Sequence, residues 1–190
     1  MSSLVLLGSE TSPFVRVVRV LALERGVSLT LEAVSPLDDD PRLLAHSPVG
    51  RIPVLLVEGG ALPDTRSACR HLAPEPRQPA DLFVEGCAHG IMEAAVALRL
   101  MSLRPAGEQH APTIARLEAR IHRIVSALPV PVPVPAWPAV GTIALACGLA
   151  YVDFRQPTRD WRPGSPALAA WMASVLPMPS MAQTAFPGGR

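Results

Sequence analysis

The sequence predicts an α/β N-terminal half followed by an all-helical C-terminal half. In the first half, apolar runs and helical patterns follow the order strand, helix, strand, β-hairpin, helix. A connector with three prolines occupies residues 74–79, and beyond it apolar residues recur every three or four positions, the period of an amphipathic helix. We therefore expect two domains, residues 1–76 and 82–190.

The first helix has the clearest boundaries in the sequence. Residues 4–7 form a short apolar run that predicts a buried strand. In the helical pattern that follows, Ser12 is a natural N-cap, Pro13 a natural first helical residue and Gly26 a natural terminator. Residues 27–34 alternate between apolar and polar side chains, which predicts a second strand.

The rest of the first half predicts a β-hairpin between two helices. Residues 36–44 are acidic and bounded by prolines, which indicates a loop leading to a short helix. The apolar run at residues 54–57 precedes Gly59-Gly60, a hairpin turn into Ala61 and Leu62. A further helix is expected from about residue 66 to residue 72.

The second half predicts a helical bundle. Two amphipathic helices have apolar positions Val84, Ala88, Ile91, Ala95 and Leu98, and Ile114, Leu117, Ile121, Ile124 and Leu128. Residues 129–138 alternate proline with valine and predict an extended connector. Residues 143–151 are almost uniformly apolar, which is typical of a helix buried on all sides. A short helix is expected at residues 166–176, and a loosely ordered tail at 177–190.

Composition argues against several classes of protein. A net charge of +1 gives no long-range field for nucleic acid or an anionic membrane. Neither a signal peptide nor an apolar run of spanning length is evident, so we expect a cytoplasmic protein. Cys69, Cys87 and Cys147 are odd in number and far apart, which favours a reducing compartment over a disulfide framework. Cys87 and His89 lack a second ligand pair at zinc spacing, so no metal is expected.

The start of the first helix is the most informative place for chemistry. A helix N-terminus presents unpaired N–H groups and roughly half a positive charge, which favours an anion. The Ser12 hydroxyl could donate a hydrogen bond to a thiolate at that position. A serine before a proline is also a common helix cap with no other role.

Two further places have a structural and a functional reading. Pro53 could simply begin a strand, or it could turn the backbone of Ile52 outward so that it pairs with an extended peptide. Asp64 or Thr65 could simply cap the next helix. Alternatively, Asp64 takes an α-ammonium group, while Thr65 and the helix amides take an α-carboxylate.

These motifs occur together in an order that resembles the bacterial glutathione transferases, with a serine-type N-terminal motif like that of the omega or zeta class. The matching N-terminal segments are residues 8–16, 47–55 and 64–69. The likeness continues through residues 90–97, 143–155 and 161–171, so it covers most of the chain in register.

The resemblance implies a thioredoxin-like N-terminal domain that binds glutathione and an all-α C-terminal domain. It implies a cis proline at Pro53, a backbone pair at Ile52 and a γ-glutamyl site at Asp64 and Thr65. The glutathione-binding residues expected from it are Phe14, Arg51, Ile52, Pro53, Asp64 and Thr65.

The expected reaction is attack of the glutathione thiolate on a hydrophobic electrophile in the interdomain cleft. Ser12 falls where serine-type relatives keep their thiol-activating hydroxyl, and Thr11 is the second choice. No cysteine lies near this helix end, which argues against mixed-disulfide chemistry. Two alternatives remain open. One is a non-catalytic binding module, and the other is a glutathione-dependent isomerase of small unsaturated diacids, in which Arg16 or Arg51 could hold carboxylates.

Two features concern assembly and folding. The resemblance implies a homodimer in which residues 66–72 face the helix that bears Glu85, His89 and Glu93 of the other subunit, although these three could equally form one wet helix face. Relatives carry an aspartate capping box before the buried helix, where this chain has Gly141 and Thr142. We therefore expect a weaker entry into that helix.

Overall fold

The computed structural model describes residues 4–128, 137–156 and 160–188, which form two compact units. The first unit contains the described residues up to Arg77 together with Pro179–Gly188, and the second contains Gln78–Met178. In the described ranges, no helix is both long enough and apolar enough to cross a membrane. The expected connector at residues 129–138 lies outside the described residues except for Trp137 and Pro138.

A four-stranded mixed sheet forms the centre of the first unit. Its strands are β1 (Leu4–Gly8), β2 (Leu29–Ala33), β3 (Val54–Val57) and β4 (Gly60–Pro63), in the order β2-β1-β3-β4. Strand β1 runs parallel to β2 and antiparallel to β3, and β3 and β4 form the expected hairpin.

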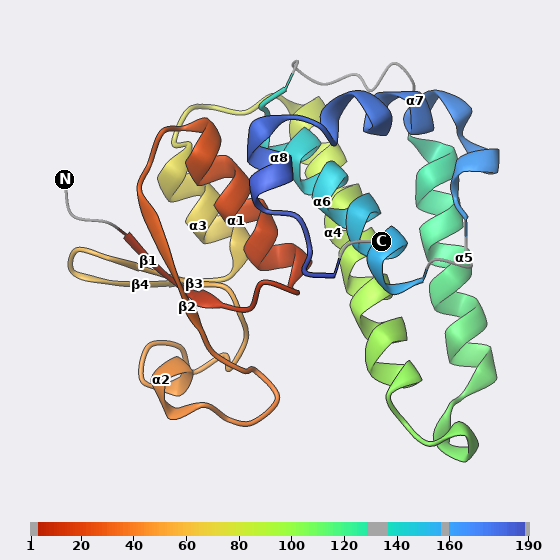
Figure 1. The fold of residues 1–190 in the computed structure, drawn as a ribbon, viewed down its shortest axis with the longest axis horizontal. Coiled ribbons are helices and arrows are strands. Elements are labelled where there is room, and N and C mark those ends of the chain that lie inside the picture. The colour runs from red at the N-terminus through yellow and green to blue at the C-terminus, as the bar shows by residue number, and fades with distance from the viewer. Residues whose placement is uncertain (1–3, 129–136, 157–159, 189–190) are drawn as a thin grey trace. The chain divides into compact units, whose positions relative to one another are not determined.

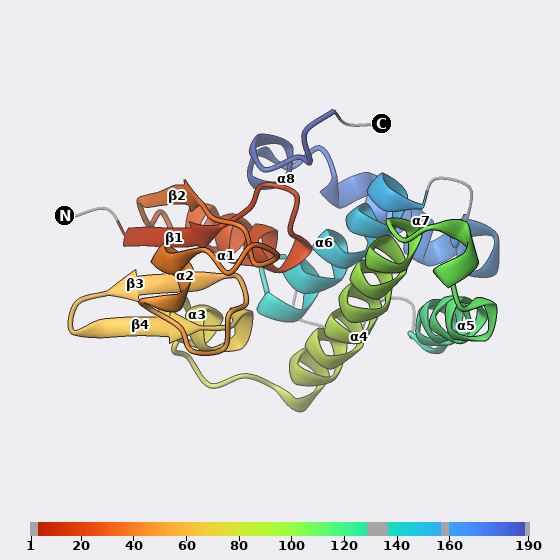
Figure 2. The same cartoon turned by 90° about the horizontal axis from the view of Figure 1, so that it is seen from below.

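Helices cover both faces of this sheet. They are α1 (Pro13–Glu24), α2 (Pro41–Leu44) and α3 (Thr65–Leu72), and a fourth helix, α8 (Pro179–Gln183), packs against α1. Helices α1 and α3 lie side by side on one face, and α2 lies on the other (Figures 1 and 2). Leu43 of α2 joins Leu7, Val34 and Val54 in a buried apolar cluster.

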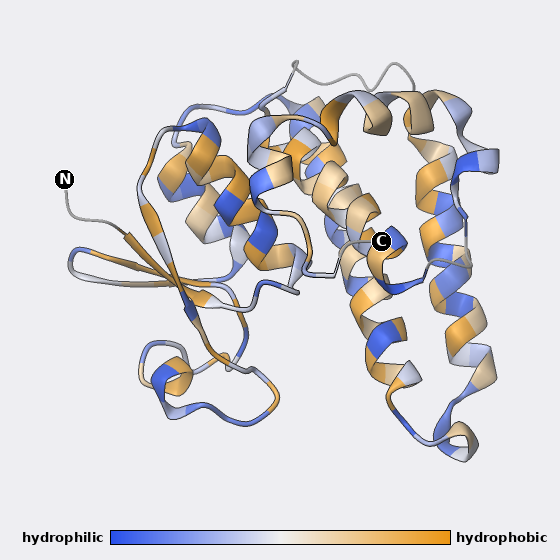
Figure 3. Ribbon diagram, in the orientation of Figure 1, coloured by the Kyte–Doolittle hydropathy of each residue, from blue (hydrophilic) through white to orange (hydrophobic). Residues whose placement is uncertain are grey.

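The second unit is built from α4 (Pro79–Ser102), α5 (Ala111–Ala127), α6 (Val140–Arg155) and α7 (Pro166–Val175), with single 3₁₀ turns at Ala106–Glu108 and Arg162–Gly164. Helix α4 packs against both α6 and α5 (Figure 1). Every residue of α6 from Val140 to Val152 is buried, as its apolar composition predicts. Helix α5 instead carries apolar and polar side chains along its whole length (Figure 3), as expected for an amphipathic helix.

The entry into α6 is capped from another helix. Asp81, in the first turn of α4, accepts a hydrogen bond from the Gly141 N–H at 2.7 Å. A Cβ atom at position 141 would lie 2.5 Å from two oxygens of Asp81, so only glycine fits there. Thr142 adds a hydroxyl bond of 2.8 Å to the Ala139 carbonyl. The expectation of a weak entry into α6 is therefore corrected, because an aspartate does cap this helix and α4 supplies it.

Two charged residues of α4 also differ from expectation. Glu85 and His89 are only 5% and 6% exposed, so they form neither a wet helix face nor an exposed surface for a second subunit. Their side chains lie one helical turn apart, with 3.8 Å between Glu85 Oε1 and His89 Nε2. Of the three residues expected together on one face, only Glu93 is exposed.

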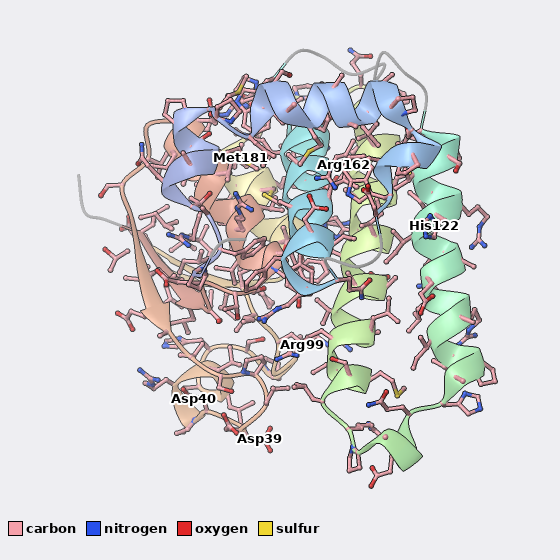
Figure 4. All side chains as sticks on the ribbon, turned by 45° about the vertical axis from the view of Figure 1, so that its right-hand side comes forward. Asp39, Asp40, Arg99, His122, Arg162 and Met181 are labelled. Carbon is pink, nitrogen blue, oxygen red and sulfur yellow. The ribbon has the colours of Figure 1, made fainter. Side chains whose placement is uncertain are left out.

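Residues Pro179–Gly188 include α8 and belong to the first unit, whereas we expected residues 177–190 to form a loosely ordered tail of the helical domain. Arg16 of α1 binds it: Nη2 donates to the Met181 carbonyl at 2.9 Å and Nε to Thr184 Oγ1 at 3.4 Å. The guanidinium also lies 4.6 Å from the centre of the Phe186 ring. Met181 lies within α8 (Figure 4). The buried guanidinium of Arg16 thus joins α1 to the C-terminal segment of the same unit.

Candidate functional site

The N-terminus of α1 has the geometry of a capped anion site. Ser12 Oγ accepts a hydrogen bond from the Val15 N–H at 3.3 Å, and the Ser12 N–H donates to the Ser9 carbonyl at 3.0 Å. Because the hydroxyl oxygen uses a lone pair in the cap, the hydroxyl proton can still be donated to another group. The half-buried Ser12 can therefore cap the helix and stabilise an anion.

Thr11 is held by the preceding turn. Its Oγ1 lies 3.0 Å from Ser9 Oγ, and its N–H donates to the same Ser9 oxygen at 3.3 Å. This local bonding constrains the threonine hydroxyl more than that of Ser12. Among the described residues, Thr11 Oγ1 is thus paired with another hydroxyl, whereas Ser12 Oγ contacts only the Val15 N–H.

The segment before β3 adopts the arrangement that the resemblance implies. The Ile52–Pro53 peptide bond is cis, and the Pro53 carbonyl accepts from the Asp64 N–H at 3.1 Å. The pairing of β3 with β1 ends at Val54, so the main chain of Ile52 lies beyond the ladder. In the described part of the chain, no turn, loop or side-chain hydrogen bond engages that main chain. Ile52 can therefore accept an extended peptide, and the exposed Arg51 precedes it.

Asp64 caps α3 from an unusual backbone conformation. Its Oδ1 accepts from the Ser67 N–H at 3.0 Å, while its φ of 83° and ψ of 159° lie in a region that residues other than glycine rarely adopt. Such strain costs about 1–3 kcal/mol and is concentrated at binding and active sites. The side chain is exposed, so the carboxylate is accessible to a cation from solution.

Thr65 is placed differently from the sequence expectation. Its side chain is 3% exposed, and its hydroxyl donates to the Phe14 carbonyl at 3.4 Å instead of pointing outward to receive a carboxylate. This bond joins the first turn of α3 to the first turn of α1. The amides at the start of α3 remain as the group that could bind an anion.

The site therefore brings together two helix N-termini and one carboxylate. Ser12 is the N-cap of α1 and Asp64 is the N-cap of α3. The hydrogen bond from Thr65 to Phe14 holds the two N-termini together. Two positive helix ends beside one exposed carboxylate match a ligand with two anionic groups and one cationic group. Sequence reasoning missed the Thr65–Phe14 contact, since the two residues are far apart in the chain.

Other residues considered from the sequence do not join this site. Arg16, considered above as a holder of carboxylates, is 3% exposed and is bound instead by the C-terminal segment. The three cysteines are free thiols, and burial raises the pKa of the Cys87 thiol. Over the described ranges, no group of three or more His, Cys, Asp or Glu side chains could hold a metal ion.

A thioredoxin-like sheet with a cis proline before β3, followed in sequence by a helical unit, is the architecture of the glutathione transferase fold. The profile of the glutathione S-transferase N-terminal domain matches residues 6–80. The uncharacterised GST-like protein YibF of Escherichia coli K12 is 28% identical over 198 residues, covering 96% of this chain and 98% of YibF.

Solved structures agree over the whole length. A glutathione transferase family member from Pseudomonas fluorescens Pf-5 with bound glutathione is 31% identical, with a TM-score of 0.88 and coverage of 97% of this chain and 100% of that one. A structure from the same organism with bound S-(propanoic acid)-glutathione gives the same identity and coverage with a TM-score of 0.84. The chain belongs to the glutathione transferase family, and its predicted fold class is confirmed.

Proposed function

We propose that this protein binds glutathione in its first unit and transfers the glutathione thiolate to a small electrophile. The observation that carries the proposal is the junction of the α1 and α3 N-termini beside Asp64, held by the Thr65–Phe14 hydrogen bond. Glutathione has complementary groups: a γ-glutamyl ammonium, carboxylates and a thiol that can ionise. The relatives from Pseudomonas fluorescens with bound glutathione and its propanoic acid conjugate support the same ligand.

Each part of glutathione has a proposed partner. Asp64 receives the γ-glutamyl ammonium group, and the first amides of α3 receive the α-carboxylate. The main chain of Ile52 pairs with the cysteinyl residue, next to Pro53. The exposed Arg51 offers a cation for the remaining carboxylate. The Phe14 carbonyl and the Thr65 hydroxyl hold the two helix ends in position.

Ser12 is the proposed thiol-activating residue. A free thiol of this kind has a pKa of about 8.5, so only a few per cent is thiolate at neutral pH. One charge-assisted hydrogen bond contributes about 1.5–3 kcal/mol, which lowers the thiol pKa by roughly one to two units. The positive end of α1 acts in the same direction. At pH 7 the thiolate fraction then rises from a few per cent to roughly a quarter to three quarters.

The test compares Ser12→Ala with the wild-type protein and with Ser126→Ala, an exposed serine on α5. We expect all three proteins to be retained on immobilised glutathione. The ultraviolet absorbance of bound glutathione thiolate should appear in the wild type and Ser126→Ala but not in Ser12→Ala. Turnover of an aryl halide should fall about tenfold or more in Ser12→Ala. Equal turnover in Ser12→Ala would remove its catalytic role. Glutathione binding without turnover in the wild type would instead favour the non-catalytic module.

Assembly and location extend the same proposal. We infer a cytoplasmic homodimer, as the family resemblance implies, with Glu85 and His89 excluded from its interface because they are buried within one chain. Light scattering of the purified protein measures the assembly, and a mass equal to one chain would contradict it.

A further inference from the structure

Asp64, the N-cap of α3, is held by more contacts than a helix cap needs. Ser67, in the first turn of the helix, donates its N–H to Asp64 Oδ1 at 3.0 Å, and this bond is the cap itself. The Ser67 hydroxyl also donates to the Pro63 carbonyl at 2.6 Å, and its oxygen lies 3.2 Å from the Asp64 carbonyl oxygen. Because a hydroxyl has one proton to donate, the shorter bond is the main one. It ties the first turn of α3 to the last residue of β4.

These contacts fix the peptide group that joins Pro63 to Asp64. Its carbonyl oxygen accepts from the Ser67 hydroxyl, and its N–H donates to the Pro53 carbonyl at 3.1 Å. The angle φ of Asp64 describes how this planar group is oriented relative to the Asp64 Cα atom. With both polar atoms of the group bound, Asp64 keeps a φ of 83°, which residues other than glycine rarely adopt. Such a conformation persists only where the surrounding structure imposes it.

The same contacts determine what Asp64 presents to a ligand. Its Oδ1 is occupied by the Ser67 N–H, and no hydrogen bond or ion pair engages Oδ2 among the residues that the structure describes. The side chain is exposed, so Oδ2 is accessible to a cation from solution. A different φ at Asp64 would turn this side chain relative to β3 and β4, and hence relative to the main chain of Ile52 that precedes β3.

An ordinary helical serine does not account for this arrangement. Serine hydroxyls often bond to a carbonyl three or four residues earlier in a helix. Ser102 and Ser174 make such bonds at 2.7 Å, to the Arg99 and Trp171 carbonyls within their own helices. Ser67 differs because its main acceptor lies in β4, on the other side of the strained residue. The helix itself does not require a serine here, since alanine is the better helix former.

We propose that Ser67 is a positioning residue for Asp64. Its hydroxyl holds the Pro63–Asp64 peptide group so that Asp64 Oδ2 receives the γ-glutamyl ammonium group of glutathione. Ser67 acts through Asp64 and makes no contact with the ligand. The inference rests on the proposed binding of glutathione, and it assigns the preference for a ligand with a free α-amino group to Asp64 and Ser67 together. The observation that carries it is the 2.6 Å hydrogen bond across the strained residue.

The test compares two ligands by isothermal titration calorimetry: glutathione and its deaminated analogue, in which hydrogen replaces the α-amino group of the γ-glutamyl residue. We expect the wild type to bind glutathione about tenfold or more tightly than the analogue, because the analogue lacks the charged hydrogen-bond donor. Ser67→Ala should reduce this preference about three- to tenfold, almost wholly through weaker binding of glutathione. Ser67→Thr keeps the hydroxyl and should retain the preference. Ser174→Ala, which removes a comparable hydroxyl bond in α7, is the matched control and should also retain it.

A second measurement checks that Ser67 acts through Asp64. In Asp64→Asn the carboxylate is already lost, so adding Ser67→Ala should change glutathione affinity by less than about twofold. Full additivity of the two substitutions would overturn the proposal. In steady-state kinetics, the KM for glutathione should rise in Ser67→Ala while kcat at saturating glutathione is retained, because the γ-glutamyl group takes no part in the attack by sulfur.

The outcomes separate this inference from the proposed function. An unchanged preference in Ser67→Ala, or equal binding of the two ligands by the wild type, would overturn the inference and leave glutathione transfer intact. A parallel loss of affinity for both ligands in Ser67→Ala would assign the hydroxyl a structural role only and also overturn it. Binding of neither ligand by the wild type would overturn both. If Ser67→Ala fails to fold, Ser67→Cys, whose thiol donates only weakly, provides the same comparison.

Discussion

Asp64 combines two roles in one residue, and they can be separated by substitution. Asp64→Asn keeps an oxygen to accept the Ser67 N–H, so the cap of α3 is retained, but the negative charge is lost. We expect glutathione affinity to fall about tenfold, since hydrogen bonds to charged groups contribute about 1.5–3 kcal/mol, while the unfolding midpoint stays the same. Calorimetric titration and thermal unfolding measure the two effects. Unchanged affinity would remove Asp64 from the γ-glutamyl site.

Asp64→Gly tests the backbone conformation at the same residue. Glycine adopts a φ of 83° without steric cost, which relieves about 1–3 kcal/mol of strain, but it also removes the side-chain cap, which contributes about 1 kcal/mol. We therefore expect the free energy of unfolding to be maintained or increased, while glutathione affinity falls as in Asp64→Asn. A clear loss of stability, measured by urea unfolding, would show that the strained conformation costs little.

At the scale of elements, α6 depends on α4 for its cap. Alanine normally stabilises a helix relative to glycine by about 1 kcal/mol. Gly141→Ala should instead destabilise the protein, because the new methyl group would lie 2.5 Å from oxygens of Asp81. Gly86→Ala in α4, where nothing lies within 4 Å of a Cβ atom, is the matched control and should stabilise. Stabilisation by both substitutions in urea unfolding would contradict the interhelical cap.

Local rules predicted the elements because their signals lie within a few residues. The Ser12 cap, the first helical proline and the glycine hairpin each depend on neighbours in the chain, and the observed bounds agree closely. The cap from Asp81 to Gly141 and the bond from Thr65 to Phe14 join residues far apart, and neither leaves a local signal. The one local hint of the Asp81–Gly141 contact is a glycine at the start of α6, where no neighbouring side chain caps the helix.

At the scale of the whole molecule, the chain returns to its first unit after completing the second. It leaves at Arg77 and returns at Pro179, and the returning segment supplies the acceptors and the ring that surround Arg16. The place of this segment leaves no local signal in the sequence, because an arginine in an apolar helix gives no indication of its distant partner. A protein cut at the predicted domain boundary would therefore lack part of its first unit.

Truncation after Met178 tests this dependence. Removal of the segment withdraws the Met181 carbonyl, the Thr184 hydroxyl and the Phe186 ring from Arg16, so unfolding should occur at lower urea concentration. Arg16→Met should destabilise the full chain but have little effect in the truncated one, giving a coupling energy on the order of 2 kcal/mol in a double-mutant cycle. Arg19→Met on the same helix is the control and should cost the same in both chains. An equal cost for Arg16→Met in both would show that the C-terminal segment does not hold α1, because the cost would then arise elsewhere around Arg16.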